Sequence, residues 1–355
     1  MRLRRCRPQP RRGSAPAGAR RCAIACGLAL AALLAGCASP AGGPQFRNGH
    51  LVQAPAGLPQ RSSIAGVPFF ADDSHACGPA SLAEVLRFSG VDTDAARLAP
   101  ELLTPALDGT LQYDMLGATR RAGRVAYVIR PRLSELFEDI AAGHPVVVLQ
   151  RLGIVGNAWH YAVVVGYDLQ RDTVTLRSST AHSLVLSIGQ FDATWAGGGR
   201  WGFVALPPGT FPARVGQLRY LRAVAPMEGV APQAARQAYR AALRRWPDAW
   251  VAMMGLGNLA YARHDYASAA RRFAQAARIH RGDGDPWNNL AQALLAGGDT
   301  ARARAAIERA LAIGKPNPAV YAATLRQIEQ AGAAAAPGPQ GPAGLSPAGA
   351  PARSD

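Results

Sequence analysis

Two motifs in the sequence carry residues suited to nucleophilic chemistry. The first is Cys77-Gly78-Pro79, in which a proline two residues after the cysteine suits the first turn of a helix. A thiol at a helix N-terminus lies at the positive end of the helix dipole, which favours the thiolate. The second motif is Trp159-His160-Tyr161, which opens a run of apolar residues. Because a histidine can take the proton of a nearby thiol, the two motifs together predict covalent catalysis at a carbonyl.

Each motif has a simpler reading when it stands alone. An isolated cysteine more often packs as a small apolar residue, and a histidine before a strand is more often structural than catalytic. The pairing of a cysteine at a helix start with a histidine at a strand start favours the catalytic interpretation.

No other chemistry is indicated, and we expect neither a metal nor a cofactor. Of the five cysteines, only Cys77 lies beyond Cys37, so a disulfide scaffold is not expected in the folded part. The remaining histidines show no spacing typical of metal ligands. Gly197-Gly198-Gly199 lacks the Lys-Ser or Lys-Thr of a phosphate-binding loop and is predicted to form a mobile rim of the active-site cleft.

The net charge of +16 would suit a nucleic-acid partner, but its distribution does not. Eight arginines precede Cys37, where no acidic residue occurs, and the others are scattered among acids. Since no basic block carries interleaved aromatic residues, we expect no nucleic-acid binding.

The first residues read as an export signal that ends at a lipid attachment site. An arginine-rich start and a short apolar run precede Leu34-Ala35-Gly36-Cys37, which resembles the bacterial lipobox. We therefore predict a signal peptide over 1–36, lipid on Cys37 and a Pro- and Gly-rich tether over 37–64. Because Ala38 is not an aspartate, the resemblance implies a cell-envelope protein anchored in the outer membrane and facing the periplasm.

The segment from 65 to 213 alternates helical patterns with short apolar runs, which predicts a mixed α and β domain. The glycine-rich stretch Trp195 to Arg200 is predicted to be a loop. The predicted helices and strands are Pro79 to Arg87 (helix), Val125 to Ile129 (strand), Ser134 to Ala142 (helix, capped by Ser134), and the strands Pro145 to Leu149, Tyr161 to Val165, Thr173 to Leu176 and Trp201 to Leu206.

Beyond Gln217 the pattern is helical and repeats every 34 residues. Small and bulky residues recur in step, as in Ala269 and Phe273 against Ala303 and Ile307. The spacing resembles the tetratricopeptide repeat, with repeats over 250–283 and 284–317 after a degenerate first one. We predict a helical domain over 217–330 and a disordered tail over 331–355.

Cys-Gly-Pro-Ala-Ser-Leu from Cys77 and Trp-His-Tyr-Ala-Val-Val-Val-Gly-Tyr-Asp from Trp159 together resemble the peptidase C39-like family of cysteine peptidases. The attached repeats resemble its lipoprotein branch. The resemblance implies an α+β papain-like fold followed by an all-α tetratricopeptide-repeat domain. It also implies that Cys77 is the nucleophile and that His160 is its base.

Two positions depart from the family pattern. Asp72 occupies the slot of a glutamine that donates to the oxyanion, and Ser178 takes the third catalytic position, where the family has an aspartate. An ionised aspartate cannot donate a hydrogen bond. Gln150 is a possible substitute donor, and a surface amide is the alternative.

Two functions follow from these patterns. One is a membrane-anchored thiol peptidase that acts on a peptide or protein, with repeats that recruit a protein partner. The alternative is a weak or inactive papain-like scaffold that binds peptides.

Overall fold

The computed structural model describes residues 45–47, 50–52, 54–72, 76–104, 106, 109–153 and 158–335. The chain divides by its contacts into residues 1–45 and 46–355, and the description below concerns the second unit. The predicted signal peptide and Cys37 lie outside the described residues.

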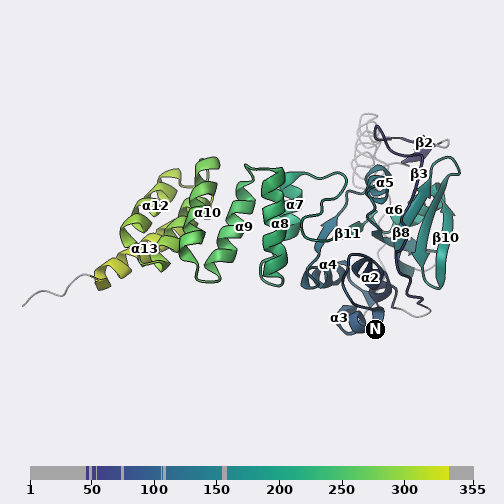
Figure 1. Ribbon diagram of the computed structural model, residues 1–355, viewed down its shortest axis with the longest axis horizontal. Coiled ribbons are helices and arrows are strands. Elements are labelled where there is room, and N and C mark those ends of the chain that lie inside the picture. Colours follow the sequence, from purple (N-terminus) through teal and green to yellow (C-terminus); the bar gives the residue numbers. More distant parts are fainter. Residues whose placement is uncertain are drawn as a thin grey trace, which may run out of the picture. The chain divides into compact units, whose positions relative to one another are not determined.

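A seven-stranded sheet organises the first half of this unit, and all its pairings are antiparallel (Figure 1). The strand order is β10-β9-β8-β7-β11-β6, with β3 paired to β8. The strands are β3 (Arg61–Ser63), β6 (Val125–Val128), β7 (Val146–Leu152), β8 (Ala158–Asp168), β9 (Thr173–Ser178), β10 (Ala181–Ser187) and β11 (Gly202–Leu206). Two small hairpins complete the strands: β1 (Phe46–Arg47) with β2 (His50–Leu51), and β4 (Leu103–Thr104) with β5 (Gly109–Thr110).

Strand β8 is the centre of the sheet and carries the predicted base. Residues 160–167 are buried, and the β-branched run Val163 to Val165 suits a strand that is covered on both faces. Its partner β7 is equally apolar from Val146 to Leu149. The strands predicted from the apolar runs are therefore present, and β8 and β9 pair as an antiparallel hairpin.

Five helices accompany the sheet in this part of the described chain. Helix α2 packs against β8, and its apolar positions Leu82, Val85 and Leu86 are buried with spacings of three and four residues. Gly90 follows it with a φ of +87°, a left-handed conformation that glycine tolerates. The helices are α2 (Cys77–Phe88), α3 (Ala95–Leu102), α4 (Gln112–Arg121), α5 (Leu133–Ala141) and α6 (Ile188–Gly197).

Three local predictions are wrong. Helix α5 begins at Leu133, so Ser134 lies inside it and does not cap it. The loop predicted over 195–200 is half correct, since 195–197 belong to α6 and 198–200 form a turn. Gly198 in that turn is buried so closely against β7 that a Cβ atom there would lie 2.0 Å from the Leu149 carbonyl oxygen, which does not fit a mobile rim. The predicted tether ends too late, since β3 pairs with β8 and belongs to the sheet.

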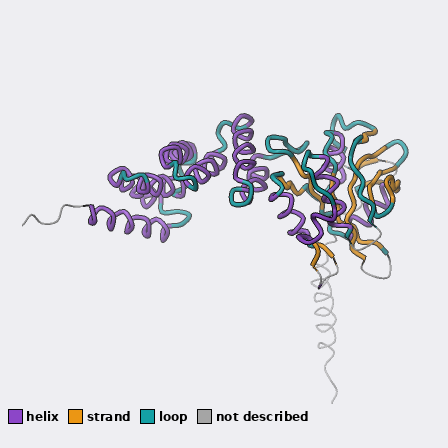
Figure 2. Tube along the Cα trace, turned by 60° about the horizontal axis from the view of Figure 1, so that its bottom comes forward, coloured by secondary structure: helices purple, strands orange, loops and turns teal. Residues whose placement is uncertain are grey.

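Beyond residue 217 the described chain contains only helices (Figure 2). Successive second helices begin 34 residues apart, at Pro232, Tyr266 and Thr300, which confirms the predicted period. The helices are α7 (Gln217–Val224), a 3-10 turn (Ala225–Met227), α8 (Pro232–Arg245), α9 (Trp250–Tyr261), α10 (Tyr266–Ile279), α11 (Asp285–Ala296), α12 (Thr300–Ile313) and α13 (Pro318–Ala335). Because α13 continues to Ala335, the tail predicted from residue 331 begins too early. No helix in the described part of the chain has both the length and the apolarity to cross a membrane.

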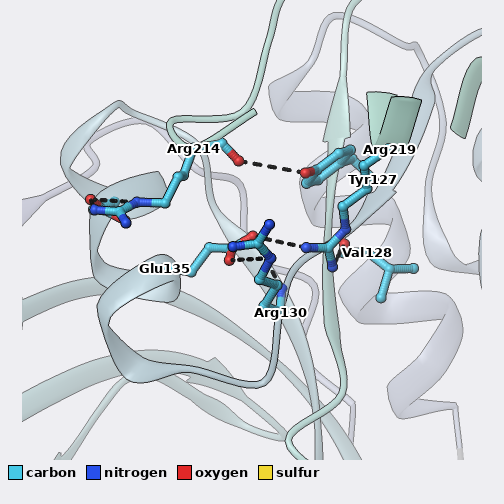
Figure 3. Close-up of polar contacts among 7 residues, drawn as sticks. Tyr127, Val128, Arg130, Glu135, Arg214 and Arg219 are labelled. Atoms are coloured by element: carbon cyan, nitrogen blue, oxygen red, sulfur yellow. Dashed lines mark hydrogen bonds and ion pairs between the residues drawn. The ribbon is translucent and has the colours of Figure 1, made fainter. Parts of the chain in front are cut away.

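A polar cluster connects α7 to strand β6 and helix α5 (Figure 3). Arg219 donates to the Val128 carbonyl at 2.9 Å, lies 3.6 Å from the buried carboxylate of Glu135, and stacks over Tyr127. The apolar core also runs without a break from the sheet to Leu259 in α9. The first repeat helices are thus part of the same core as the sheet, and removing them would expose apolar surface.

Candidate active site

Cys77 is the first residue of α2, as the Cys-Gly-Pro motif predicted, and it is half-buried. Burial raises the pKa of its thiol above the ordinary value, and the charge of Asp72 raises it further. Main-chain N–H groups of Tyr161, Gly78 and Cys77 oppose this effect by hydrogen bonding to the sulfur. The helix N-terminus therefore supplies donors, but burial prevails and the pKa of the thiol is raised.

His160 lies in β8 and is 7% exposed. Its Nε2 atom is 2.8 Å from the hydroxyl of Ser178 at the end of β9, so the hairpin brings together the predicted base and the residue predicted to take the third catalytic position. A hydroxyl can donate to or accept from this nitrogen, depending on the tautomer. Burial lowers the pKa of His160, and the charge of Asp72 partly offsets this effect.

Asp72 lies close enough to act electrostatically on both the thiol and the imidazole. It is 8% exposed, and its main-chain N–H donates to the carbonyl of Ser179 at 3.1 Å. This bond ties the segment before the nucleophile to the turn that follows Ser178. The predicted residues Asp72, Cys77 and Ser178 line one small cavity, which places them at a single site.

The cavity beside Cys77 measures about 10 Å³, which is room for about one water molecule. A peptide segment cannot enter this space without displacement of side chains or main chain around it.

Sequence reasoning missed two charged residues that line this cavity, Glu84 and Arg177. Glu84 is 2% exposed, and its Oε1 accepts the N–H of Phe70 at 3.2 Å while its Oε2 has no hydrogen-bond partner among the described residues. Burial raises the pKa of Glu84 to about 7, against a smaller opposing effect of Arg177. An acid among the buried positions of an apolar helix was the signal that could have found it.

Tyr161 connects the surroundings of Cys77 to strand β5. Its hydroxyl donates to the Thr110 carbonyl at 3.1 Å, and a Cβ atom on Gly78 would lie only 2.5 Å from the Thr110 hydroxyl. The glycine after the cysteine is therefore required by the close approach of β5 to the start of α2.

Gln150 is neither a surface amide nor a free donor. It is 2% exposed, and its Nε2 donates to the Thr194 hydroxyl of α6 at 2.6 Å. This bond directs the amide to α6, so the substitute oxyanion role is not supported. Across the described residues, no group of three His, Cys, Asp or Glu side chains is arranged to hold a metal.

Two kinds of known protein family match two successive parts of the chain. The profile of the peptidase C39 like family matches residues 60–197, and two tetratricopeptide repeat profiles match residues 231–286 and 260–328. The chain carries a C39-like peptidase domain followed by tetratricopeptide repeats. The predicted family and fold class are thereby confirmed.

Individual relatives are distant. An uncharacterized protein of Methanothermobacter thermautotrophicus is 34% identical over 101 residues, which is 28% of this chain and 64% of that protein. The chain thus spans slightly less than two thirds of that relative. A Bacillus anthracis crystal structure named as a C39-like peptidase aligns with a TM-score of 0.35 and 17% identity, over 41% of this chain and 97% of the other.

Proposed function

We propose that this C39-like chain is a thiol peptidase that hydrolyses peptide bonds through Cys77, His160 and Ser178. The observation that carries the proposal is the contact of Ser178 with His160 Nε2, in a hairpin whose Tyr161 N–H also reaches the Cys77 sulfur. A thiol at a helix start and an oriented imidazole are the two parts that nucleophilic amide hydrolysis needs.

The reaction begins from neutral groups. Because burial raises the pKa of the thiol and lowers that of the imidazole, the proton stays on sulfur until substrate arrives. With Nε2 engaged by Ser178, His160 takes the thiol proton on Nδ1 while Cys77 Sγ attacks the carbonyl carbon. The C–N bond then breaks, the amine leaves with that proton, and water hydrolyses the thioester to restore the thiol and release the carboxylic acid.

Stabilisation of the oxyanion falls to the main chain in this proposal. Asp72 occupies the glutamine slot, and its charge opposes a developing negative charge. The N–H groups of Cys77 and Gly78 at the start of α2 already face the sulfur, so they are the donors best placed for a neighbouring oxyanion.

The peptidase is tested with a quenched fluorescent peptide library and Cys77→Ala as the blank. Cleavage by the wild type, abolished in both Cys77→Ala and His160→Ala, supports the proposal. Absence of cleavage of every library peptide by the folded wild type, or cleavage that Cys77→Ala retains, would contradict it.

A second candidate function is a peptide-binding scaffold without turnover. The raised pKa of the Cys77 thiol favours it, as does the neutral hydroxyl of Ser178 beside His160 Nε2, where the family has a carboxylate. Co-purification with Cys77→Ser separates the two, because a peptidase accumulates an uncleaved substrate only in the variant, whereas a scaffold retains the same peptide in both forms.

We further propose that the chain is anchored through lipid on Cys37 to the outer membrane, facing the periplasm, and that the repeats recruit a protein partner or substrate. Leu34-Ala35-Gly36-Cys37 supports the anchor. Metabolic labelling with an alkyne fatty acid should mark the wild type and Cys26→Ala equally, and should not mark Cys37→Ala. Equal labelling of Cys37→Ala would refute lipid attachment at this site.

A further inference from the structure

A cleft of about 260 Å³ in the repeat region is lined by five arginines and one aspartate. It is bounded by α8, α9 and α10, and Leu256 and Ala260 of α9 add apolar surface. The charged residues that line it are Arg236, Arg240, Arg263, Arg271, Arg272 and Asp265.

Asp265 is the one acid that lines the cleft, and although it interacts electrostatically with Arg271 and Arg263, it cannot balance five positive charges. The Nε and Nη2 atoms of Arg236 are buried without a hydrogen-bond partner among the described residues. Three others bond to neutral groups: Arg263 to the Leu259 carbonyl, Arg271 to Ser268 and Arg272 to Gln275. The two buried donor atoms of Arg236 cost free energy unless a group outside the chain supplies acceptors, whereas Arg240, Arg263 and Arg271 are exposed and open to a ligand.

The repeat architecture itself does not require these arginines. The next cleft along the repeats, between α10, α11 and α12, is lined by residues 34 positions later in the chain, including Leu290, Leu294 and Asp299. There, Ala270, Ala274 and Gly297 stand where the first cleft has Arg236, Arg240 and Arg263. The second cleft is also lined by Arg271, Arg278 and Arg302, but at these three positions it forms with small neutral residues. Arg236, Arg240 and Arg263 of the first cleft therefore call for a separate explanation.

We propose that the cleft lined by Arg236, Arg240 and Arg263 binds a carboxylate-rich peptide segment of a partner protein. Guanidinium groups bind carboxylates in a planar two-bond geometry, and several of them converge here. Leu256 and Ala260 suit an aliphatic side chain between the acids. No aromatic side chain is among the residues lining this cleft, so the stacking platform that single-stranded nucleic acid prefers is missing.

This inference rests on the recruiting role proposed for the repeats and is independent of peptidase activity. The acidic partner is a substrate or an adaptor, and in either case its acidic segment contacts α8 and α10. Alkylation of Cys77 reports on the peptidase site separately, so the two proposals can fail independently.

The test measures fluorescence anisotropy of a fluorescein-labelled peptide, Glu-Glu-Leu-Glu-Glu, titrated with the full chain. The triple variant Arg236→Ala, Arg240→Ala and Arg263→Ala places small neutral residues at the three positions where the second cleft has them, and it should weaken binding at least tenfold. Arg326→Gln removes one exposed positive charge on α13, outside the cleft, and should leave binding within twofold. Added salt should weaken binding by the wild type more than by the triple variant.

Three results would overturn the proposal. They are wild-type binding that the triple variant retains, equal binding of Gln-Gln-Leu-Gln-Gln, and tighter binding of a ten-residue oligothymidylate than of the acidic peptide. If the triple variant fails to fold, Arg240→Gln with Arg271→Gln replaces it, since both side chains are exposed and keep most of their length. A loss of at least threefold is then expected, and no loss would refute the site.

Discussion

The hydroxyl of Ser178 lies 2.8 Å from Nε2 of His160, in the position where a charged carboxylate would hold the imidazole more strongly. A neutral hydrogen bond of this kind contributes a net stabilisation of about 0.5 to 1.5 kcal/mol. The serine can therefore orient the ring, but it cannot stabilise an imidazolium as an anion would.

Ser178→Ala should lower kcat/KM by at most about tenfold, which corresponds to the loss of one neutral hydrogen bond. Cys77→Ala and His160→Ala should each remove nearly all activity, because they delete the groups that make and break bonds. The three variants are compared on one peptide substrate, with circular dichroism as the check on folding. A loss for Ser178→Ala as complete as that for His160→Ala would show that the hydroxyl has a direct catalytic role.

Ser178→Asp should have the opposite effect on the imidazole. A carboxylate beside Nε2 favours the protonated ring, so the pKa of His160 should rise. Proton NMR of the imidazole C2–H follows this titration, with His160→Ala used to assign the signal. An unchanged or lower pKa in Ser178→Asp would show that residue 178 does not face the ring in solution.

Asp72 should slow thiolate formation at Cys77. Burial first, and then the charge of Asp72, raise the pKa of the thiol. Asp72→Asn keeps the shape and removes the charge, so alkylation by iodoacetamide at pH 8 should become several-fold faster and its pH profile should move to lower pH. Asp92→Asn, at an exposed ion pair with Arg87, is the control and should leave the profile unchanged.

Slower alkylation of Asp72→Asn would contradict this electrostatic account. It would mean that the carboxylate acts mainly by raising the pKa of His160, which it also does, and so supports proton transfer from sulfur. Asp72 would then be a positioning residue for the base.

The sequence was sufficient for the parts of the fold that rest on local patterns. The β-branched run in β8, the Cys-Gly-Pro start of α2 and the recurrence of Ala269 at Ala303 each determine local conformation, and all three are found as predicted. Strand β10 was missed because it is an exposed edge strand with few buried residues, and edge strands carry a weak apolar pattern.

The electrostatics of the site could not be predicted in the same way. The sequence showed a thiol at a helix N-terminus, which alone favours the thiolate, whereas the pKa of Cys77 is raised because residues distant in sequence bury it. Burial of Gln150 against Thr194 is likewise a tertiary contact. Desolvation depends on what covers a group, and no local pattern records that.

Glu84 should make the stability of the protein fall as pH rises. Its pKa in the folded protein is about 7, against an ordinary value of 4.5, so between these values the folded state holds a proton that the unfolded state has lost. The contribution of Glu84 to the free energy of unfolding is therefore greatest below pH 4.5. It falls as the pH rises through 7, by up to about 3 kcal/mol. Urea denaturation at pH 5 and pH 8 measures the change.

Glu84→Gln is the matched comparison, because its amide oxygen can still accept the Phe70 N–H. The variant and the wild type should have similar stability at pH 5, and the variant should be the more stable at pH 8. Parallel stability curves across this range would show that Glu84 is ionised and paired in solution.

Gly78→Ala should destabilise the start of α2 by about 1–3 kcal/mol, since overpacking of a buried contact costs that much. The added Cβ would lie 2.5 Å from Oγ1 and 2.6 Å from Cβ of Thr110, and neither atom is the end of a long flexible side chain. Thr110→Gly removes both atoms, so a double-mutant cycle should show that Gly78→Ala costs much less in that background.

Gly117→Ala in α4 is the control, because its Cβ would meet only the flexible end of Arg121 at 3.2 Å and helix propensity favours alanine by about 1 kcal/mol. If Gly78→Ala is as well tolerated as Gly117→Ala, then Thr110 of β5 does not contact the start of α2 this closely in solution. If Gly78→Ala is destabilised as expected, the added Cβ should also displace the thiol of the neighbouring Cys77. The rate of iodoacetamide labelling of Cys77 should then change in Gly78→Ala and return toward the wild-type rate in the double variant.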